Sequence, residues 1–391
     1  MRILVLHSRY ATGSSSGENR VVQDEVELLR ERGHEVTDWS PMPPEDRARQ
    51  ALLGARAVWS PSAVRELRAQ IRSHHPDVIH VHNLFPLLSP AVLRTAAAPV
   101  VLTLHNYRLL CLPATFLRDG KTCEDCLGRA PWRGVGHRCY RGSVAGSASL
   151  AASITLHRRL RTFDRVARFL AVSEFVRDKY IEAGFDSGRM VVKPNFVPAT
   201  AQRRGPGRDF LYLGRLSVEK GLGALMPIWA QVPARLLVVG DGPERAGLER
   251  GAPGNVRFVG SVSEREVPDL LREARALVLP SICYEGAPRT VVEAFAAGVP
   301  VVGSRLGAIP TIVEQEVTGM LAAPGRRDEW LSAVFRLLDD GESERMGAAA
   351  HQSWSDRFSP ARAAAELESV YNAVLRQSQP RNRDRVCDAA G

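Results

Sequence analysis

Short apolar runs alternate with amphipathic segments along the chain, and the series occurs twice. In the first half the apolar runs read RILVLH, DVIHVH, PVVLTLH, RFLAVS and MVVKPN, and in the second half DFLYLGRL, RLLVVGDG, VRFVGSV, ALVLPS and VPVVGS. Between them lie helical patterns such as ENRVVQDEVELLRERG, where Val22, Val26 and Leu29 share one face and Gly33 ends the helix. Two series of strand–helix units predict an α/β protein with two parallel-sheet domains, each with helices on both faces of its sheet.

The polar, Gly- and Pro-containing stretch 198–209 predicts a linker between an N-terminal domain, residues 1–197, and a C-terminal domain, residues 210–358. A last helix is predicted over residues 359–378, with a serine cap and a proline at its first position. We expect this helix to pack back on the N-terminal domain. Residues 379–391 carry no core-forming pattern, so we expect a disordered tail.

Composition places the chain among soluble globular proteins. It has 391 residues, 45% hydrophobic and 24% charged, which suits two domains of ordinary size. The opening MRILVLH is too short an apolar run for a signal peptide, and no run approaches the roughly 20 apolar residues of a membrane span. We therefore expect a cytoplasmic protein.

The net charge of +9 and the pI near 9.6 would attract nucleic acid, an anionic membrane or a phosphorylated substrate. The basic residues are spread along the chain, and no helix-turn-helix or zinc-finger spacing accompanies them, so we expect no nucleic-acid partner. The Arg-rich segment 156–169 could touch an anionic membrane at its inner face. A solvated helix face is the favoured reading of that segment.

The segment SICYEGAPRTVVEAFAAGVPVV contains two glutamates eight residues apart, Glu285 and Glu293. It follows the buried run ALVLP and reads as strand, tight loop, helix and strand, with Pro288 suited to the start of the helix and Gly298 just past its end. In such a unit the loop and the helix N-terminus lie at the carboxyl edge of the sheet, where backbone N–H groups attract phosphate. A carboxylate there makes sense if it points past the phosphate, toward hydroxyl groups.

A candidate ligand-binding loop follows the first strand of each half. The stretch GRLSVEKG carries Arg215 and Lys220 at the mouth of a helix, where an arginine fork and a lysine charge suit a diphosphate. Lys220 is one of only four lysines, which favours a specific role over that of an ordinary surface cation. In ATGSSSGENR, Gly13 and Gly17 would let the backbone approach a ligand before the first helix starts.

These motifs, in order, resemble the retaining GT-B glycosyltransferases of family 4. The second half contributes GRLSVEKG, LLVVGDGPE, VRFVGSVSEREVPDLL, YEGAPRTVVEAFAAGVPVVGSRLGAIPTIV and TGMLAAPG, and the first half SGENRVVQDEVELLRERGHEV, DVIHVHN, VLTLHN, LAVSEFVRDKY and KPNFV. The resemblance covers about residues 2 to 375. It implies the GT-B fold, in which two Rossmann-like, doubly wound parallel-sheet domains face a cleft, the first binding the acceptor and the second the nucleotide sugar.

The resemblance also implies roles for particular residues. Glu285 would contact hydroxyls of the transferred sugar, Glu293 would hold the ribose, and His105 would lie under the donor sugar near the reacting carbon. His80 and His82 are predicted to orient the strand end structurally. Many members carry a glycine where this chain has Pro288, which has no N–H to give a phosphate. The diphosphate would be received by Arg215, Lys220, the Gly17 loop and the amides around Gly286, Ala287 and Arg289, and the nucleobase by the backbone near Ser261 and Val262.

The activity implied by the resemblance is transfer of a sugar from a nucleotide diphosphate sugar to an acceptor hydroxyl, with retention of anomeric configuration. The acceptor would be a saccharide, a lipid-linked molecule or a small molecule. We expect no catalytic cofactor and no divalent metal, because the cations and the helix N-terminus would stabilise the departing diphosphate. Two alternatives are a non-hydrolysing nucleotide-sugar epimerase, which shares the architecture, and a non-catalytic sugar-nucleotide-binding protein.

Four of the six cysteines, Cys111, Cys123, Cys126 and Cys139, lie in or next to an expected insertion over residues 106–142. A Cys-x2-Cys pair with two further thiols has the spacing of a structural zinc site, and a cytoplasmic location disfavours stable disulfides. Free thiols are an equal alternative, and an iron–sulfur cluster is a weaker one.

Overall fold

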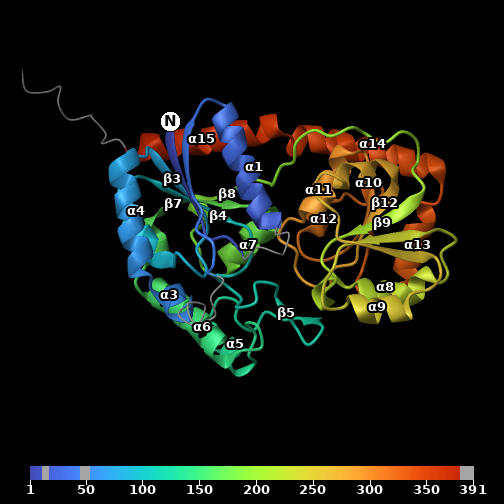
Figure 1. Cartoon of the computed structure of the whole chain (residues 1–391), viewed down its shortest axis with the longest axis horizontal. Coiled ribbons are helices and arrows are strands. Elements are labelled where there is room, and N and C mark those ends of the chain that lie inside the picture. Colours follow the sequence, from blue (N-terminus) through green and yellow to red (C-terminus); the bar gives the residue numbers. More distant parts are fainter. Residues whose placement is uncertain (11–16, 45–52, 379–391) are drawn as a thin grey trace, which may run out of the picture.

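The computed structural model describes residues 1–10, 17–44 and 53–378. They form two domains side by side, each built on a six-stranded, all-parallel sheet (Figure 1). The expected positions Gly13 and 379–391 lie outside the described residues. The two sheets confirm the predicted pair of doubly wound, Rossmann-like domains.

The sheet of the N-terminal domain has the strand order β2-β1-β3-β4-β7-β8. Its central strand β3 is buried along its whole length, as its run of Val, Ile and His residues between covered faces requires. The strands are β1 (Arg2–His7), β2 (Glu35–Trp39), β3 (Val78–Asn83), β4 (Val100–Leu104), β7 (Val166–Ala171) and β8 (Met190–Val192).

The sheet of the C-terminal domain has the order β11-β10-β9-β12-β13-β14, so β9 and β12 are its central pair. The chain order reverses between these two strands, and such a switch point is where open α/β sheets bind ligands. The strands are β9 (Asp209–Leu213), β10 (Leu236–Val239), β11 (Val256–Gly260), β12 (Ala274–Leu279), β13 (Val301–Ser304) and β14 (Gly319–Ala322).

Serine caps fix the starts of several N-terminal helices. The hydroxyl of Ser143 accepts the N–H of Gly146 at the start of α6, and the hydroxyl of Ser173 accepts that of Val176 at the start of α7. The described α-helices of this domain's sheet layers are α1 (Gly17–Glu31), α3 (Leu53–Val58), α4 (Pro61–His74), α6 (Val144–Arg159) and α7 (Glu174–Glu182), with the 3₁₀ turns η1 (Pro90–Arg94), η2 (Thr162–Arg165) and η3 (Ser187–Arg189).

The helices of the C-terminal domain cover both faces of its sheet, and they enclose two apolar clusters around Phe295 and Trp229. They are η4 (Val218–Lys220), α8 (Leu222–Trp229), α9 (Arg245–Gly251), α10 (Val267–Glu273), α11 (Arg289–Ala296), α12 (Ile309–Ile312), α13 (Arg327–Arg336) and α14 (Asp340–Arg357).

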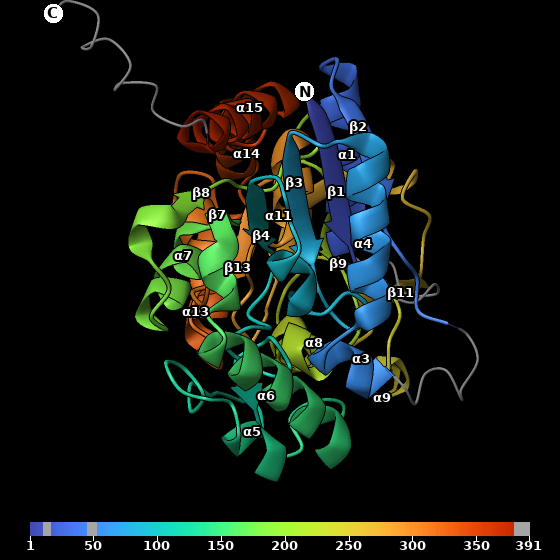
Figure 2. The same cartoon turned by 90° about the vertical axis from the view of Figure 1, so that its left-hand side faces the viewer.

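The last described helix, α15 (Pro360–Ser378), returns to the N-terminal domain (Figures 1 and 2). Its apolar face, with Val370, Tyr371 and Val374, packs in one cluster with Ile3 and Val5 of β1. The first domain is therefore completed by the far end of the chain.

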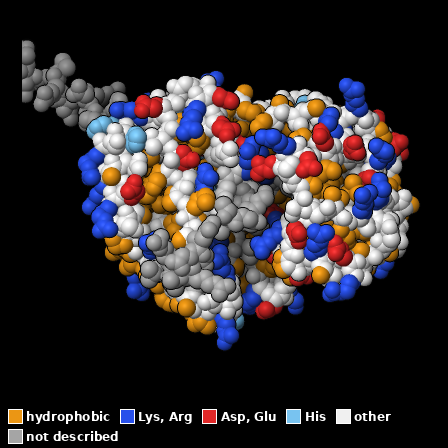
Figure 3. Space-filling view, in the orientation of Figure 1, with side chains coloured by type: hydrophobic (Ala, Val, Ile, Leu, Met, Phe, Trp, Pro, Cys, Tyr) orange, Lys and Arg blue, Asp and Glu red, His pale blue; other side chains and the backbone are white. Residues whose placement is uncertain are grey.

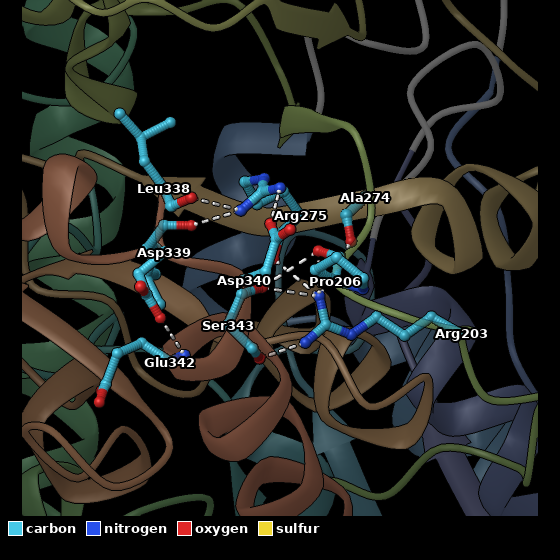
Figure 4. A network of polar contacts seen from close by, with 10 residues as sticks. Arg203, Pro206, Ala274, Arg275, Leu338, Asp339, Asp340, Glu342 and Ser343 are labelled. Carbon is cyan, nitrogen blue, oxygen red and sulfur yellow. Dashed lines mark hydrogen bonds and ion pairs between the residues drawn. The ribbon is translucent and has the colours of Figure 1, made fainter.

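The connection 198–209 is fastened to the C-terminal domain by Arg203 (Figure 4). Its guanidinium donates to the carbonyls of Pro206 at 2.8 Å and Arg275 at 2.9 Å, and to the hydroxyl and the carbonyl of Ser343 in α14. Five donors in a rigid fork suit several carbonyls at once. The second half of this connection is therefore held against the C-terminal domain.

Residues 106–142, the predicted insertion, lie at the lower end of the N-terminal domain (Figure 1), and Tyr107, Leu112 and Phe116 pack in the core of that domain. They contain the hairpin of β5 (Leu117–Arg118) and β6 (Lys121–Thr122) and the short helix α5 (Arg133–Gly136). Arg158 of α6 donates to the carbonyls of Leu109 and Arg129, at 3.0 and 3.1 Å. This arginine of the segment 156–169 thus ties the insertion to the domain.

Each sheet has an edge strand that the apolar runs did not predict, β2 in the first and β14 in the second. Each pairs with one neighbour only. β2 has the mixed sequence EVTDW and is only partly buried, whereas β14 is a buried run of four residues, GMLA. Helix α11 begins at Arg289, with Pro288 as the residue before it. Among the described residues, no helix is long and apolar enough to cross a membrane.

Candidate active site

The site is built around the loop between β12 and α11, where the second domain meets the first. Gly286 touches the end of β4, because a Cβ on it would lie 2.8 Å from the carbonyl oxygen of His105. Gly221 has φ +70° and approaches the carbonyl of Pro280 so closely that a Cβ would lie 2.0 Å from that oxygen. Glycine is required at both places, because any side chain would push the loops apart.

Lys220 and Glu285 form an ion pair, with the lysine Nζ donating to Oε1 of Glu285 at 2.8 Å. The hydroxyl of Ser281 donates to the same oxygen at 2.6 Å. Burial raises the pKa of Glu285, but the charge of Lys220 and the two hydrogen bonds outweigh burial and leave the pKa lowered. The carboxyl is therefore ionised at neutral pH. The two side chains remain 28% and 12% exposed, so both can be reached by a ligand.

Arg289 joins the second glutamate to the other domain. Its Nε donates to Oε1 of Glu293 at 2.8 Å, and its Nη1 donates to Oδ2 of Asp24 in α1 at 2.6 Å. Arg20 holds the other oxygen of Asp24 at 2.8 Å and reaches Glu264 of the C-terminal domain at 3.3 Å. Burial raises the pKa of Glu293, and Arg289 opposes this rise. A chain of alternating charges thus spans the domain junction.

The N-terminal domain also holds the carbonyls of the loop after β12. The hydroxyl of Tyr107 donates to the carbonyl of Glu285 at 3.2 Å, and the hydroxyl of Ser173 donates to that of Gly286 at 2.6 Å. The amide of Asn195 donates to the carbonyl of Ala287 at 3.3 Å. Because three successive carbonyls are fixed, the peptide planes of the loop are fixed as well.

His105 follows β4 and is half-buried, and desolvation of its ring lowers its pKa to about 3. The imidazole is therefore neutral at physiological pH. Its Nε2 lies 2.9 Å from Nδ1 of His82 at the end of β3. His82 and His105 line a cavity of about 30 Å³, the size of a water molecule, together with Asn106.

The remaining predicted ligands lie at the carboxyl ends of three strands. Arg215 is exposed in the loop after β9, Val262 is half-buried after β11, and Gly17 starts α1. On the face seen in Figure 3, basic and acidic side chains are interspersed over both domains. The net positive charge is thus not gathered into one patch on that face.

Sequence reasoning missed several polar groups at the junction, among them Asp24, Ser281 and Glu18. An oxygen of Glu18 accepts from the amide of Asn106 at 2.9 Å and from the hydroxyl of Tyr10 at 3.2 Å. Burial raises the pKa of Glu18 to about 7. Its place directly after Gly17, at the start of α1, was the signal that could have identified it.

The four cysteines of the insertion region form no disulfide. Backbone hydrogen bonds hold Cys123 to Phe116 and Cys139 to Gly134, at 2.8 and 2.9 Å. Burial raises the pKa of Cys111 to about 11, which disfavours its thiolate. Among the described residues, the one set of three potential ligands with donor atoms within 4.8 Å of one another is Glu25, His80 and His82, and it contains no cysteine.

Comparisons with known proteins agree with this arrangement. The family model "Glycosyltransferase Family 4" matches residues 15–200, and "Glycosyl transferases group 1" matches residues 207–340. A 2-deoxystreptamine glucosyltransferase of Streptomyces kanamyceticus is 27% identical over 343 residues, covering 83% of this chain and 84% of that protein. A phosphatidyl-myo-inositol mannosyltransferase of Mycolicibacterium smegmatis is 25% identical over 380 residues, covering 89% and 88%.

Solved structures show the same fold. Sucrose-phosphate synthase of Thermosynechococcus elongatus superposes with a TM-score of 0.72 at 18% identity, covering 96% of this chain and all of that one. HepE of Anabaena, in complex with UDP and glucose, gives 0.67 at 18% identity, covering 95% of this chain and all of HepE. The protein is therefore a glycosyltransferase with the GT-B fold. Both of its domains are matched by the corresponding family models, and the chain belongs to the family 4 type of these enzymes.

Proposed function

We propose that the protein transfers a hexosyl group from a nucleotide diphosphate sugar to an acceptor hydroxyl, with retention of configuration and without a divalent metal. The observation that carries this proposal is the Lys220–Glu285 ion pair, at 2.8 Å, at the switch point of the second sheet and beside the end of β4. At this place Lys220 could bind a diphosphate, and Glu285 beside it could accept hydrogen bonds from sugar hydroxyls.

The donor would lie mainly on the C-terminal domain. Lys220, Arg215 and the N-terminus of α11 would receive the diphosphate, and Glu293 the ribose hydroxyls. The backbone at Val262 would meet the base. HepE was solved with UDP and glucose, which supports a nucleotide sugar of this kind as donor. The contact with Arg289 uses only Oε1 of Glu293, which is 23% exposed, so its other oxygen would be available to the ribose while the charge chain across the junction is kept.

The chemistry follows from where charge develops. The bond between the anomeric carbon and the phosphate oxygen breaks, and its electron pair leaves with the diphosphate. The acceptor oxygen bonds to the same face of the carbon, and its proton passes to an oxygen of the leaving diphosphate. Lys220 and Arg215 stabilise the leaving group, while Glu285 and His105 position the sugar.

The two alternatives differ in what they do with the donor. An epimerase would convert one nucleotide sugar into another, and a binding protein would leave it unchanged. Both are disfavoured because the matched relatives named above are glycosyltransferases along most of the chain.

A screen of UDP-, GDP- and dTDP-sugars by thermal shift, followed by NMR of the reaction with candidate acceptors, tests the proposal. We expect one nucleotide class to raise the melting temperature, and diphosphate release to accompany a product of unchanged anomeric configuration in the presence of EDTA. Transfer lost in EDTA and restored by Mg²⁺ would contradict metal independence, and an inverted product would contradict retention. Epimer formation, or stabilisation without turnover, would favour the corresponding alternative.

A further inference from the structure

Behind His105, the N-terminal domain buries an ion pair next to two more histidines. Glu25 of α1 and Lys193, which follows β8, are each only 1% exposed, and the lysine Nζ lies 2.5 Å from Oε2 of the glutamate. His80 and His82 of β3 are fully buried beside them. Burying two charges is costly, so a pair this deep needs a structural or functional reason.

The pair connects to His105 through His82. Oε1 of Glu25 lies 3.1 Å from Nδ1 of His80 and 3.4 Å from Nε2 of His82. Nε2 of His82 is buried and has no hydrogen-bond partner among the described residues. On its other side, Nδ1 of His82 lies 2.9 Å from Nε2 of His105. A small adjustment at the 3.4 Å contact would make the row continuous from Lys193 to His105, and the unpaired, buried Nε2 of His82 favours that adjustment.

The protonation states along this row follow from burial and charge. Burial raises the pKa of Glu25, but the charge of Lys193 and a hydrogen bond from His80 outweigh burial and hold the pKa well below its ordinary value. Burial lowers the pKa of both His82 and His105, the latter to about 3. At neutral pH the glutamate is therefore ionised and both imidazoles are neutral.

A metal ion is a poor alternative occupant of this cluster, although Glu25, His80 and His82 bring three potential ligand atoms together. The Lys193 ammonium already contacts the carboxylate and would repel a cation. The ring of His80 is also engaged, with Nδ1 2.7 Å from the hydroxyl of Tyr371 and Nε2 2.7 Å from that of Thr103. The cluster is thus better described as a hydrogen-bond network.

We propose that Lys193, Glu25 and His82 are positioning residues that fix His105 in one tautomer. An ionised carboxylate can only accept, so Nε2 of His82 must carry the proton. Nδ1 of neutral His82 is then an acceptor, which requires the proton of His105 to be on Nε2. His105 is left with Nδ1 as a hydrogen-bond acceptor and cannot present a donor from that atom. The role of this acceptor toward a donor sugar rests on the proposed function, but the tautomer does not.

Long-range ¹H–¹⁵N NMR of the full-length protein with ¹⁵N-labelled histidine measures the tautomer directly. The signals of His105 are assigned by their loss in His105→Asn. We expect His105 to appear in the Nε2–H form alone between pH 6 and 8. His157 is an internal reference, because its Nε2 lies 3.0 Å from the carbonyl of Val58, which can only accept.

The double variant Glu25→Gln/Lys193→Met removes both charges and keeps the side-chain volumes similar. We expect the Nδ1–H form of His105 to appear, with His157 unchanged, and kcat to fall by about tenfold or more while KM for the donor changes by less than about twofold. Should this variant fail to fold, His82→Phe keeps a ring in place and removes both nitrogens, and the same shift is expected.

A His105 that carries its proton on Nδ1 in the wild type would overturn the proposal, as would an unchanged tautomer in a folded variant. Failure of the proposed function gives a different result. In that case the wild type shows the Nε2–H form, and the variants shift it, but no nucleotide sugar is turned over. The two conclusions are therefore tested separately.

Discussion

At the scale of single residues, the Lys220–Glu285 pair is the most direct target. Glu285→Gln and Lys220→Ala should each lower turnover by at least about tenfold, because each removes a charge that would face the diphosphate or the sugar. Both side chains are partly exposed, so the fold should persist. Lys121→Ala is the matched control, since Lys121 is exposed on the β6 hairpin. Turnover near that of the wild type in either variant would remove that residue from the site.

The neutral, half-buried His105 predicts a dependence of stability on pH. The pKa of His105 is about 3 in the folded chain and near 6.5 when unfolded, so the unfolded state binds more protons between these values. The contribution of the neutral His105 imidazole to the free energy of unfolding is complete above pH 6.5 and decreases as the pH falls toward 3. Urea titrations at pH 7.5 and 5.5 measure the free energy of unfolding. Between these two pH values we expect it to fall by roughly 1 kcal/mol less in His105→Asn than in the wild type. An equal loss in both proteins would mean that His105 is not held in neutral form.

The sequence singled out Glu285, Lys220 and Glu293 as candidates, because each lies within a short motif whose strand–loop–helix context is local. Their role in the site stays a prediction. Asp24 and Glu25 could not be selected in this way. They lie within an ordinary amphipathic helix, where charged residues usually face water. Their partners Arg289 and Lys193 are more than 160 positions away in the chain. Only the packing of distant elements shows that both are buried.

At the scale of elements, strands likewise differ in how clearly their own sequence identifies them. The central strands were predicted because burial on both faces leaves a continuous apolar run. The edge strands β2 and β14 were missed because EVTDW mixes charged and apolar residues and GMLA is only four residues long and begins with glycine. The other two edge strands, β8 and β11, were predicted. The start of α11 was predicted one residue too early, at Pro288, which instead lies just before the helix.

The insertion carries an element-scale prediction that stays open, a structural zinc bound by Cys111, Cys123, Cys126 and Cys139. Binding would require the four sulfurs to close around the ion, and it would give the hairpin region of residues 106–142 a fixed shape. Elemental analysis after purification in metal-free buffer should find about one zinc per chain, retained when nucleotide sugar is added. Less than about 0.2 zinc or iron per chain would favour free thiols.

At the scale of the whole molecule, the buried contact between Asp24 and Arg289 should hold the two domains together. Asp24 is 2% exposed, and its loss leaves Arg289 without its partner across the junction. Asp24→Asn should therefore open the molecule and increase its radius of gyration in X-ray scattering. Glu264→Gln is the matched control, because Glu264 crosses the same junction but is 59% exposed. An equal increase in both variants, or none in Asp24→Asn, would contradict this role.

The return of α15 to the first domain has a consequence for how the chain is made. Ile3 and Val5 leave the ribosome long before Val370, Tyr371 and Val374, which cover them in the folded chain. At the usual rates of synthesis, roughly 20 to 70 seconds separate the two events. Until α15 is made, the apolar surface around Ile3 and Val5 of the nascent N-terminal domain stays uncovered. Chaperones can bind this surface during that interval. The N-terminal domain is therefore completed only after α15 has been made.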